Sequence, residues 1–127
     1  MVQINQLSIK PFSPVAYYDK HLDCIRVKTH DRSVTEHRID GFITLNECNR
    51  RGQFDPEYVG FTIKGVHHLF KQIGLEIEGV YKLTDLLGKI VRLRPSTTMA
   101  EASRFILSTY EKDDSLNELE VRMSDAA

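Results

Sequence analysis

The sequence predicts an α+β domain: an antiparallel β-meander of three or four strands, followed by two or three α-helices packed on the sheet. Between residues 15 and 64, apolar and polar residues alternate with the two-residue period of a strand that has one buried face. After residue 65, apolar residues recur at the three- and four-residue spacing of an amphipathic helix. We therefore assign the meander to 15–64 and the helical half to 65–112.

Length and composition indicate one ordinary globular domain, which we place at 1–112. The chain has 127 residues, of which 41% are hydrophobic and 28% charged, and its formal net charge is −1. With so small a net charge, binding to nucleic acid or to anionic lipid would need a local patch. The sequence begins without the basic and apolar regions of a signal peptide, and no apolar run approaches the ~20 residues that cross a bilayer. We expect a cytoplasmic protein with no membrane association.

Three segments supply the strands. Residues 15–45 are predicted to form a β-hairpin whose turn is THDRS, and YVGFTIK follows as the third strand. A further edge segment is predicted in QLSIKPF, and Pro11 and Pro14 suit an edge or an entry loop. Strand alternation assigns to the core face Ile25, Val27, Ile39, Ile43, Leu45, Val59, Phe61 and Ile63.

The other face of this hairpin is half apolar, so it needs a cover from the helices or from a second subunit. Its charged residues, Glu36, Arg38 and Asp40, are expected to pair across the strands with Arg26. We expect a homodimer at micromolar concentration. The candidate interface consists of the apolar residues of this face: Leu22, Cys24, Val34 and Phe42.

The two cysteines, Cys24 and Cys48, are expected to be free thiols with no catalytic role. In the predicted hairpin they lie roughly 20 Å apart, at ~3.3 Å per residue, which is too far for a disulfide. No CxxC motif or Cys/His cluster indicates zinc.

The helical half begins with a stripe formed by Val66, Leu69, Phe70 and Ile73, and Gly74 is expected to end that helix. The segment LEIEGVYK is predicted to be a short strand or a loop. For residues 83–94 both a helix, with Thr84 as its N-cap, and a short strand remain open.

A stronger helix signal follows Pro95. Thr98 and Glu101 are predicted to form a capping box, and one helix face is lined by Met99, Ala102, Ile106 and Tyr110. Residues 113–127 form an acidic tail, which is expected to fray apart from one helical turn after Ser115.

The stretch GFTIKGVHHLFK has two features that suggest chemistry. Gly60 and Gly65 have the spacing of a phosphate-binding loop, but Val66 and His67 stand where that loop needs lysine and Ser/Thr. Adjacent His67 and His68 would point ~100° apart on a helix, so they cannot face one metal ion together. We expect no metal site and no cofactor, and we interpret the stretch as a strand followed by a helix.

Basic residues around this junction form a candidate nucleic-acid patch. His67 and Lys71 share a helix face with Lys64 and His68 nearby, and the long loop 46–57 contributes two arginines. The role of that loop stays open. The candidate patch comprises Arg50, Arg51, Lys64, His67, His68 and Lys71.

The sequence contains no recognisable catalytic constellation, so no catalytic residue is assigned. The leading interpretation is a non-catalytic interaction module that self-associates or binds a protein partner. Two alternatives are nucleic-acid binding through the basic patch and a small hydrolase that uses His37 or His67.

Three segments, YYDKHLDCIRV, RIDGFITL and YVGFTI, resemble the YuzE-like family of small bacterial domains of unknown function. The resemblance covers about residues 17–66, and it implies a β-meander with a helix and self-association, with no established catalytic residues. The loop NECNRRGQFDPE and the helical half depart from the family pattern. The matching positions are Tyr18, Asp19, Ile25, Val27, Ile43, Val59 and Gly60.

Overall fold

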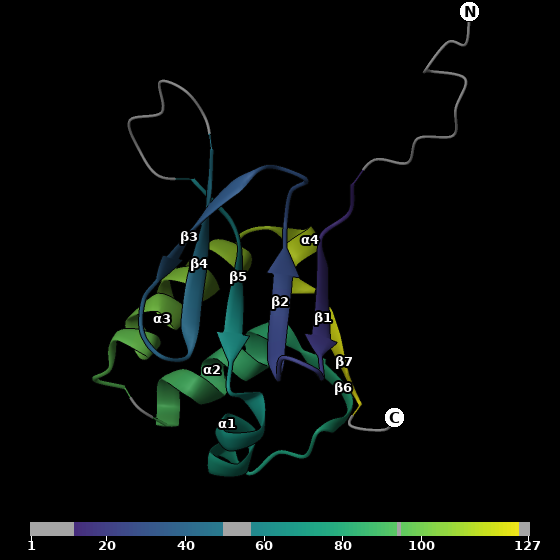
Figure 1. Ribbon diagram of the computed structural model, residues 1–127, viewed down its shortest axis with the longest axis vertical. Coiled ribbons are helices and arrows are strands. Elements are labelled where there is room, and N and C mark those ends of the chain that lie inside the picture. The colour runs from purple at the N-terminus through teal and green to yellow at the C-terminus, as the bar shows by residue number, and fades with distance from the viewer. Residues whose placement is uncertain (1–11, 50–56, 94, 125–127) are drawn as a thin grey trace, which may run out of the picture.

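The computed structural model describes residues 12–49, 57–93 and 95–124, and it confirms the α+β class (Figure 1). Five strands form an antiparallel sheet: β1 (Val15–Asp19), β2 (Cys24–Lys28), β3 (Val34–Arg38), β4 (Ile43–Cys48) and β5 (Tyr58–Lys64). A second sheet pairs β6 (Glu78–Lys82) with β7 (Glu120–Ser124). The helices are α1 (Val66–Ile73), α2 (Leu83–Leu93), α3 (Thr98–Tyr110) and α4 (Asp114–Asn117). Nearly all of the predicted edge segment QLSIKPF lies outside the described residues.

The first half of the chain forms two hairpins, where the sequence predicted one. Asp19 Oδ1 accepts hydrogen bonds from the His21 and Leu22 backbone N–H groups at 3.1 and 3.2 Å, which closes the β1–β2 turn. Asp40 closes the β3–β4 turn in the same way. Such Asx turns reverse the chain inside segments whose alternation predicts continuous strands. The predicted turn at THDRS is therefore wrong, because this segment connects the two hairpins.

The strand order in the sheet is β1-β2-β5-β4-β3, so β5 lies between the hairpins and β3, β4 and β5 form a three-stranded meander (Figure 1). Gly60 makes this arrangement possible. A Cβ atom at this position would lie 2.1 Å from the Val27 carbonyl oxygen of β2, and Gly60 has a φ of +153°. Without a side chain, the backbone of β5 can approach β2 closely.

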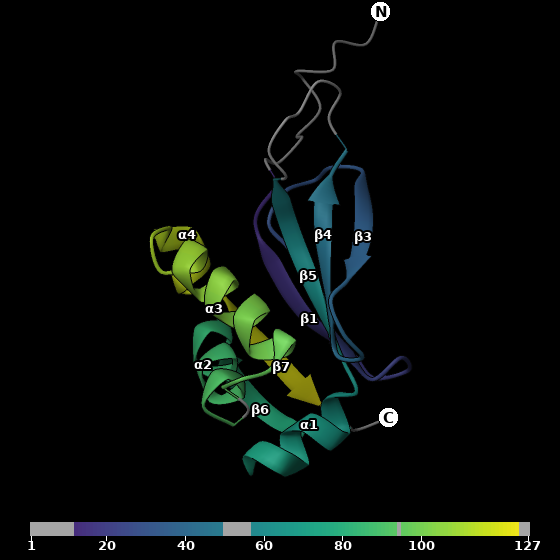
Figure 2. The same cartoon turned by 90° about the vertical axis from the view of Figure 1, so that its left-hand side faces the viewer.

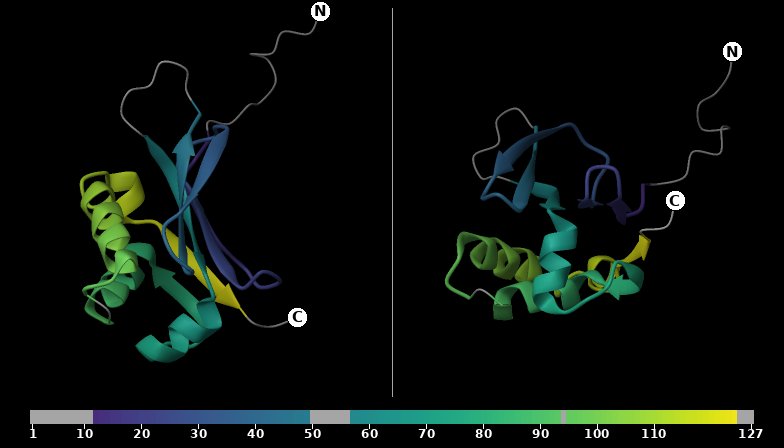
Figure 3. Two further views of the ribbon diagram at one scale, coloured as in Figure 1. Left: turned by 60° about the vertical axis from the view of Figure 1, so that its left-hand side comes forward. Right: turned by 60° about the horizontal axis from the view of Figure 1, so that its bottom comes forward.

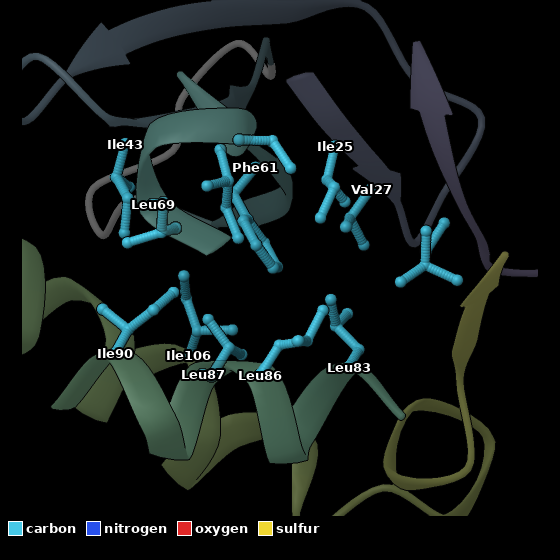
Figure 4. Close-up of a cluster of buried hydrophobic side chains, with 14 of the residues drawn as sticks. Ile25, Val27, Ile43, Phe61, Leu69, Leu83, Leu86, Leu87, Ile90 and Ile106 are labelled. Carbon is cyan, nitrogen blue, oxygen red and sulfur yellow. The ribbon is translucent and has the colours of Figure 1, made fainter. Parts of the chain in front are cut away.

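A hydrophobic cluster fills the space between the sheet and the helices (Figure 4). Side chains of β2, β4 and β5 point toward the apolar stripe of α2, which supplies Leu83, Leu86, Leu87 and Ile90. The predicted core-facing strand residues are buried, with the exception of Ile39. Ile39 is 37% exposed because it lies just beyond β3, in the turn to β4.

The helices confirm most of the predicted pattern. Residues 83–93 form α2, and Gly74 ends α1 in the left-handed conformation. Two predicted N-caps are wrong. Helix α2 already begins at Leu83, so Thr84 lies within its first turn. Thr97 caps α3, accepting a hydrogen bond from Ala100 N at 3.2 Å, whereas Thr98 is the first helical residue.

The described residues of the acidic tail, 113–124, are part of the fold, which corrects the expectation that they fray. They contain α4 and β7, and Val121 and Met123 of β7 are only 0% and 1% exposed. Strand β7 pairs with β6 and contacts β1 along the edge of the larger sheet (Figure 1). The alternation of buried and exposed residues in β7 is that of a half-buried strand.

Figure 2 shows α2, α3 and α4 on one side of the five-stranded sheet and α1 at its lower end. The two views of Figure 3 agree that β3 lies on the outer side of β4, away from β5. All five residues of β3 are exposed, so the sheet extends one strand beyond the layer of helices.

We expect Gly60→Ala to destabilise the fold strongly. The added methyl group would overlap the Val27 carbonyl of β2, and the backbone conformation of Gly60 is unfavourable for alanine. Overpacking and backbone strain together should lower the free energy of unfolding by about 3 kcal/mol. Urea unfolding followed by circular dichroism measures this change. Gly41→Ala is the matched control, because a Cβ at Gly41 meets no atom within 4 Å. Equal stability of the two variants would contradict the close approach of β2 and β5.

Candidate functional site

The structure describes four of the six residues of the predicted basic patch. Lys64, His67, His68 and Lys71 lie at the end of β5 and on α1. Arg50 and Arg51 lie outside the described residues. The residues that flank this segment, Asn49 and Glu57, adjoin the opposite end of β5, roughly 20 Å from Lys64 along a seven-residue strand.

Both histidines of α1 contact the turns of the hairpins. The His68 ring stacks on Phe42, with ring centroids 6.3 Å apart and an interplanar angle of 12°. His67 Nδ1 lies 2.6 Å from Asp23 Oδ1. These contacts hold α1 against the β1–β2 and β3–β4 turns, so we assign both histidines a structural role.

Asp23 caps α1 from another element of the fold. It lies in the β1–β2 turn with a φ of 51°, and its two carboxylate oxygens accept the His67 backbone N–H at 3.1 and 3.2 Å. The Tyr18 hydroxyl donates to Asp23 Oδ1 at 2.9 Å. Gly65, the N-cap residue of α1, has no side chain that could accept a hydrogen bond from the first backbone N–H groups of the helix. The carboxylate therefore supplies the cap that the local sequence lacks.

The protonation of Asp23 fits this role. Burial raises the pKa of its carboxyl group, but hydrogen bonds from His67 and Tyr18 outweigh burial and hold the pKa below its ordinary value. Asp23 is thus a carboxylate at neutral pH. Its negative charge interacts favourably with the positive, N-terminal end of the α1 dipole.

A second histidine–carboxylate pair joins β3 to β4. His37 Nε2 lies 2.6 Å from Glu47 Oε2, and the two side chains are 46% and 31% exposed. A histidine and a carboxylate in contact are a common part of hydrolytic sites, but such a site also needs a nucleophile within reach.

The Cys24 thiol is 2% exposed, and burial raises its pKa, which disfavours the reactive thiolate. Within the described ranges, no three His, Cys, Asp or Glu residues are grouped so that they could hold a metal ion.

The candidate interface residues do not form one surface. Leu22 is 62% exposed in the β1–β2 turn, whereas Val34 lies at the other end of the sheet, where it pairs with Cys48. Cys24 is buried, and Phe42 packs against the core.

The charged residues of the hairpins also pair differently from the prediction. Arg26 Nε lies 3.9 Å from Asp19 Oδ2, and β5 and β4 separate Arg26 from β3. Both cysteines are free, as predicted, and Cys24 of β2 lies opposite Lys64 of β5.

The open edge of the large sheet is β3. Strand β4 is its one neighbour in the described structure, whereas β1 at the opposite edge contacts β7. At the two ends of the β3–β4 ladder, Ile39 N donates to Ile43 O and Asn49 N donates to Ser33 O, both at 2.9 Å. Hydrogen-bonded pairs alternate in an antiparallel ladder, so odd-numbered residues of β3 bond to β4. The N–H and C=O groups of Val34, Glu36 and Arg38 therefore point outward.

An apolar groove of about 350 Å³ lies on the helix side of the sheet, beside Ile39 at the end of β3. Ile39 and Leu45 line it from the sheet, and Phe105 of α3, which is 51% exposed, lines the opposite wall. Tyr58 also lines the groove and meets Phe105 edge to face, with ring centroids 5.7 Å apart. The arrangement combines outward backbone groups with an apolar surface beside them. It can bind an extended polypeptide.

Sequence reasoning missed both the tertiary cap and the open edge, although each had a signal. Gly65 opens α1 with no capping side chain in the local sequence, so the cap had to come from elsewhere. Residues 35–38, TEHR, are polar on both faces of the strand, a pattern typical of an edge.

Comparison of the chain with protein-family models, with curated proteins and with solved structures found no match. The resemblance of residues 17–66 to the YuzE-like family therefore rests on the strand patterning alone. In the part of the chain that the structure describes, no helix is both long and apolar enough to cross a membrane.

We expect Asp23→Ala to lower the free energy of unfolding by about 2 kcal/mol, because it removes the α1 cap and places alanine at a positive φ. Asp23→Asn should cost less, since asparagine tolerates this conformation and keeps a side-chain acceptor. The carboxylate has a lowered folded pKa, so its stabilising effect is present above the unfolded pKa of about 3.9 and is lost as the pH falls through the folded pKa.

Urea unfolding of the wild type and of Asp23→Asn, from neutral pH down to roughly pH 2, measures this effect. The difference in stability between the two proteins should shrink at acid pH. A difference that stays constant over this range would show that the charge of Asp23 does not stabilise the fold.

Proposed function

We propose that this chain is a non-catalytic interaction module that binds an extended segment of a protein partner along the open edge of β3. One observation carries the proposal. Strand β3 is the outer strand of a five-stranded sheet, and all five of its residues are exposed. The opposite edge strand, β1, contacts β7 of the second sheet. Binding by strand addition uses an edge of this kind, because the main chain supplies hydrogen bonds and alternate side chains supply specificity.

Both requirements of strand addition are met at β3. The outward N–H and C=O groups of Val34, Glu36 and Arg38 can extend the ladder by one strand. On the helix side, alternate side chains of the added strand would lie over the groove that Ile39 and Phe105 line. Partial burial of Phe105, now 51% exposed, would add apolar contact to the backbone hydrogen bonds.

The charges of β3 restrict which strand can be added. Charged residues on an edge commonly prevent indiscriminate pairing of sheets. Glu36 and Arg38 have opposite signs and lie two residues apart, so they share the face of β3 that points away from the groove. A partner strand with the complementary charges is favoured, and other strands are disfavoured.

The alternatives from the sequence have less support. The four described members of the basic patch lie at the end of β5 and on α1, where His67 contacts Asp23 and His68 stacks on Phe42. The two histidine–carboxylate pairs hold secondary-structure elements together. Neither of these histidines is among the residues that line the groove beside β3.

We expect Glu36→Pro to abolish binding while the fold is kept. Proline at this position removes an N–H group that points outward, so the β3–β4 ladder is preserved. Random nonapeptides displayed on phage would be selected on the immobilised wild-type protein and counter-selected on Glu36→Pro. Enriched peptides, made synthetically, should bind the wild type and slow amide hydrogen exchange at Val34, Glu36 and Arg38.

Glu36→Ala is the matched control, because it removes the same charge and keeps the backbone N–H. It should retain binding of most selected peptides. If no selected peptide discriminates between the wild type and Glu36→Pro, or if the protected amides lie outside β3, the proposed function is wrong.

A further inference from the structure

We infer that the strand that pairs with β3 is β3 of a second copy of this chain, antiparallel, with a two-fold axis that passes beside His37. The two five-stranded sheets would then form one continuous sheet across the dimer. This inference rests on the proposed function, because it names the partner that occupies the same edge. Charge complementarity within β3 itself selects both the partner and the register.

The charges on the outer face of β3 match in one register. When the axis passes beside His37, Glu36 of each copy lies directly opposite Arg38 of the other copy. The interface then contains two equivalent Glu–Arg pairs. Opposite charges directly across an antiparallel ladder are stabilising, whereas like charges in that position are destabilising.

Neighbouring registers do not have this match. Since directly opposite residues share a face, a symmetric antiparallel pair can be centred on any single residue of β3. Centring on Glu36 places Glu36 opposite its own copy, and centring on Arg38 does the same for Arg38. Centring on Thr35 places the apolar Val34 opposite Glu36. The arrangement centred on His37 is therefore favoured over its neighbours.

The backbone agrees with this register. Glu36 and Arg38 carry outward N–H and C=O groups, as the ladder to β4 requires. Paired across the axis, they exchange both hydrogen bonds, whereas His37 faces its own copy as a pair without backbone hydrogen bonds. In such pairs the side chains lie closest together.

The helix-side face of the dimer is consistent with the same axis. Each His37 lies 2.6 Å from Glu47 of its own chain, so a carboxylate accompanies each imidazole where the two histidines meet. Thr35 of each copy lies opposite Ile39 of the other copy. This contact covers part of the Ile39 side chain, which is 37% exposed in the monomer.

Charge reversal tests the register. Glu36→Arg alone places two arginines opposite each other at both pairs, and Arg38→Glu alone places two glutamates opposite each other. Each variant should raise the dissociation constant of the dimer roughly tenfold or more. An equimolar mixture of the two variants restores both opposite-charge pairs and should form a heterodimer. The double variant E36R/R38E should form a homodimer.

Sedimentation equilibrium and light scattering over a micromolar concentration series measure these states against the monomer mass of 14.6 kDa. Glu111→Arg and Lys112→Glu are the matched controls, because they make the same charge changes at exposed positions after α3. Both controls should dimerise like the wild type. If the mixture of Glu36→Arg and Arg38→Glu does not associate more tightly than either variant alone, the register is wrong.

Cysteine cross-linking gives a second test. His37→Cys places two thiols opposite each other, with Cβ atoms about 5 Å apart, and mild oxidation should link the dimer. In Thr35→Cys, each thiol lies opposite Ile39, so the two thiols are four residues apart, on the order of 13 Å, and should not link. Cys24 and Cys48 are buried in the wild type, which serves as the background control. Faster linkage of Thr35→Cys or Glu36→Cys than of His37→Cys would overturn the register.

The outcomes separate this inference from the proposed function. A wild-type protein that stays monomeric throughout the concentration series overturns the inference, whereas strand addition by selected peptides can still be observed. A dimer that persists in Glu36→Pro shows that the copies associate through another surface, which also overturns the inference. Loss of both the dimer and peptide binding in Glu36→Pro supports the inference and the proposed function together.

Discussion

The close approach of β2 and β5 at Gly60 joins the two hairpins into one sheet, and the rest of the structure depends on it. With β5 in the centre, the β1–β2 and β3–β4 turns lie at the same end of the sheet as α1. Lys64 N donates to Phe42 O, and Val66 N donates to Asp23 O, so both turns meet the junction of β5 and α1. The same strand order places β3 outermost, beyond the helices.

The sequence predicted the hydrophobic spacing within each segment better than it predicted which strands lie side by side. Buried residues such as Ile25, Phe61 and Leu69 follow from two-residue and helical spacing, because these patterns are local. The reversals at Asp19 and Asp40 were missed, since a single Asx turn inside an alternating segment leaves the hydrophobic pattern almost unchanged. Pairing of β2 with β5 depends on contacts between residues far apart in the chain, which local spacing does not report.

The candidate site was predictable only in part, because it too depends on which strands are neighbours. The expectation of an interaction module came from a half-apolar sheet face, but the apolar residues of that face are divided between buried positions and separate turns. The open edge depends on which strand has no second neighbour, and that is a property of the strand order. His67 illustrates the opposite error. Its position beside other basic residues suggested binding, whereas its contact with Asp23 is part of a helix cap.

The position of β7 has a consequence for how the chain folds. It contacts β1 and contributes Val121 and Met123 to the same core that β1 helps to form. These two strands are separated by on the order of a hundred residues, and such distant contacts slow folding because a long loop must close first. During synthesis β1 would be exposed until β7 has left the ribosome. The growing chain would thus present β1 without the contact that β7 makes in the finished fold.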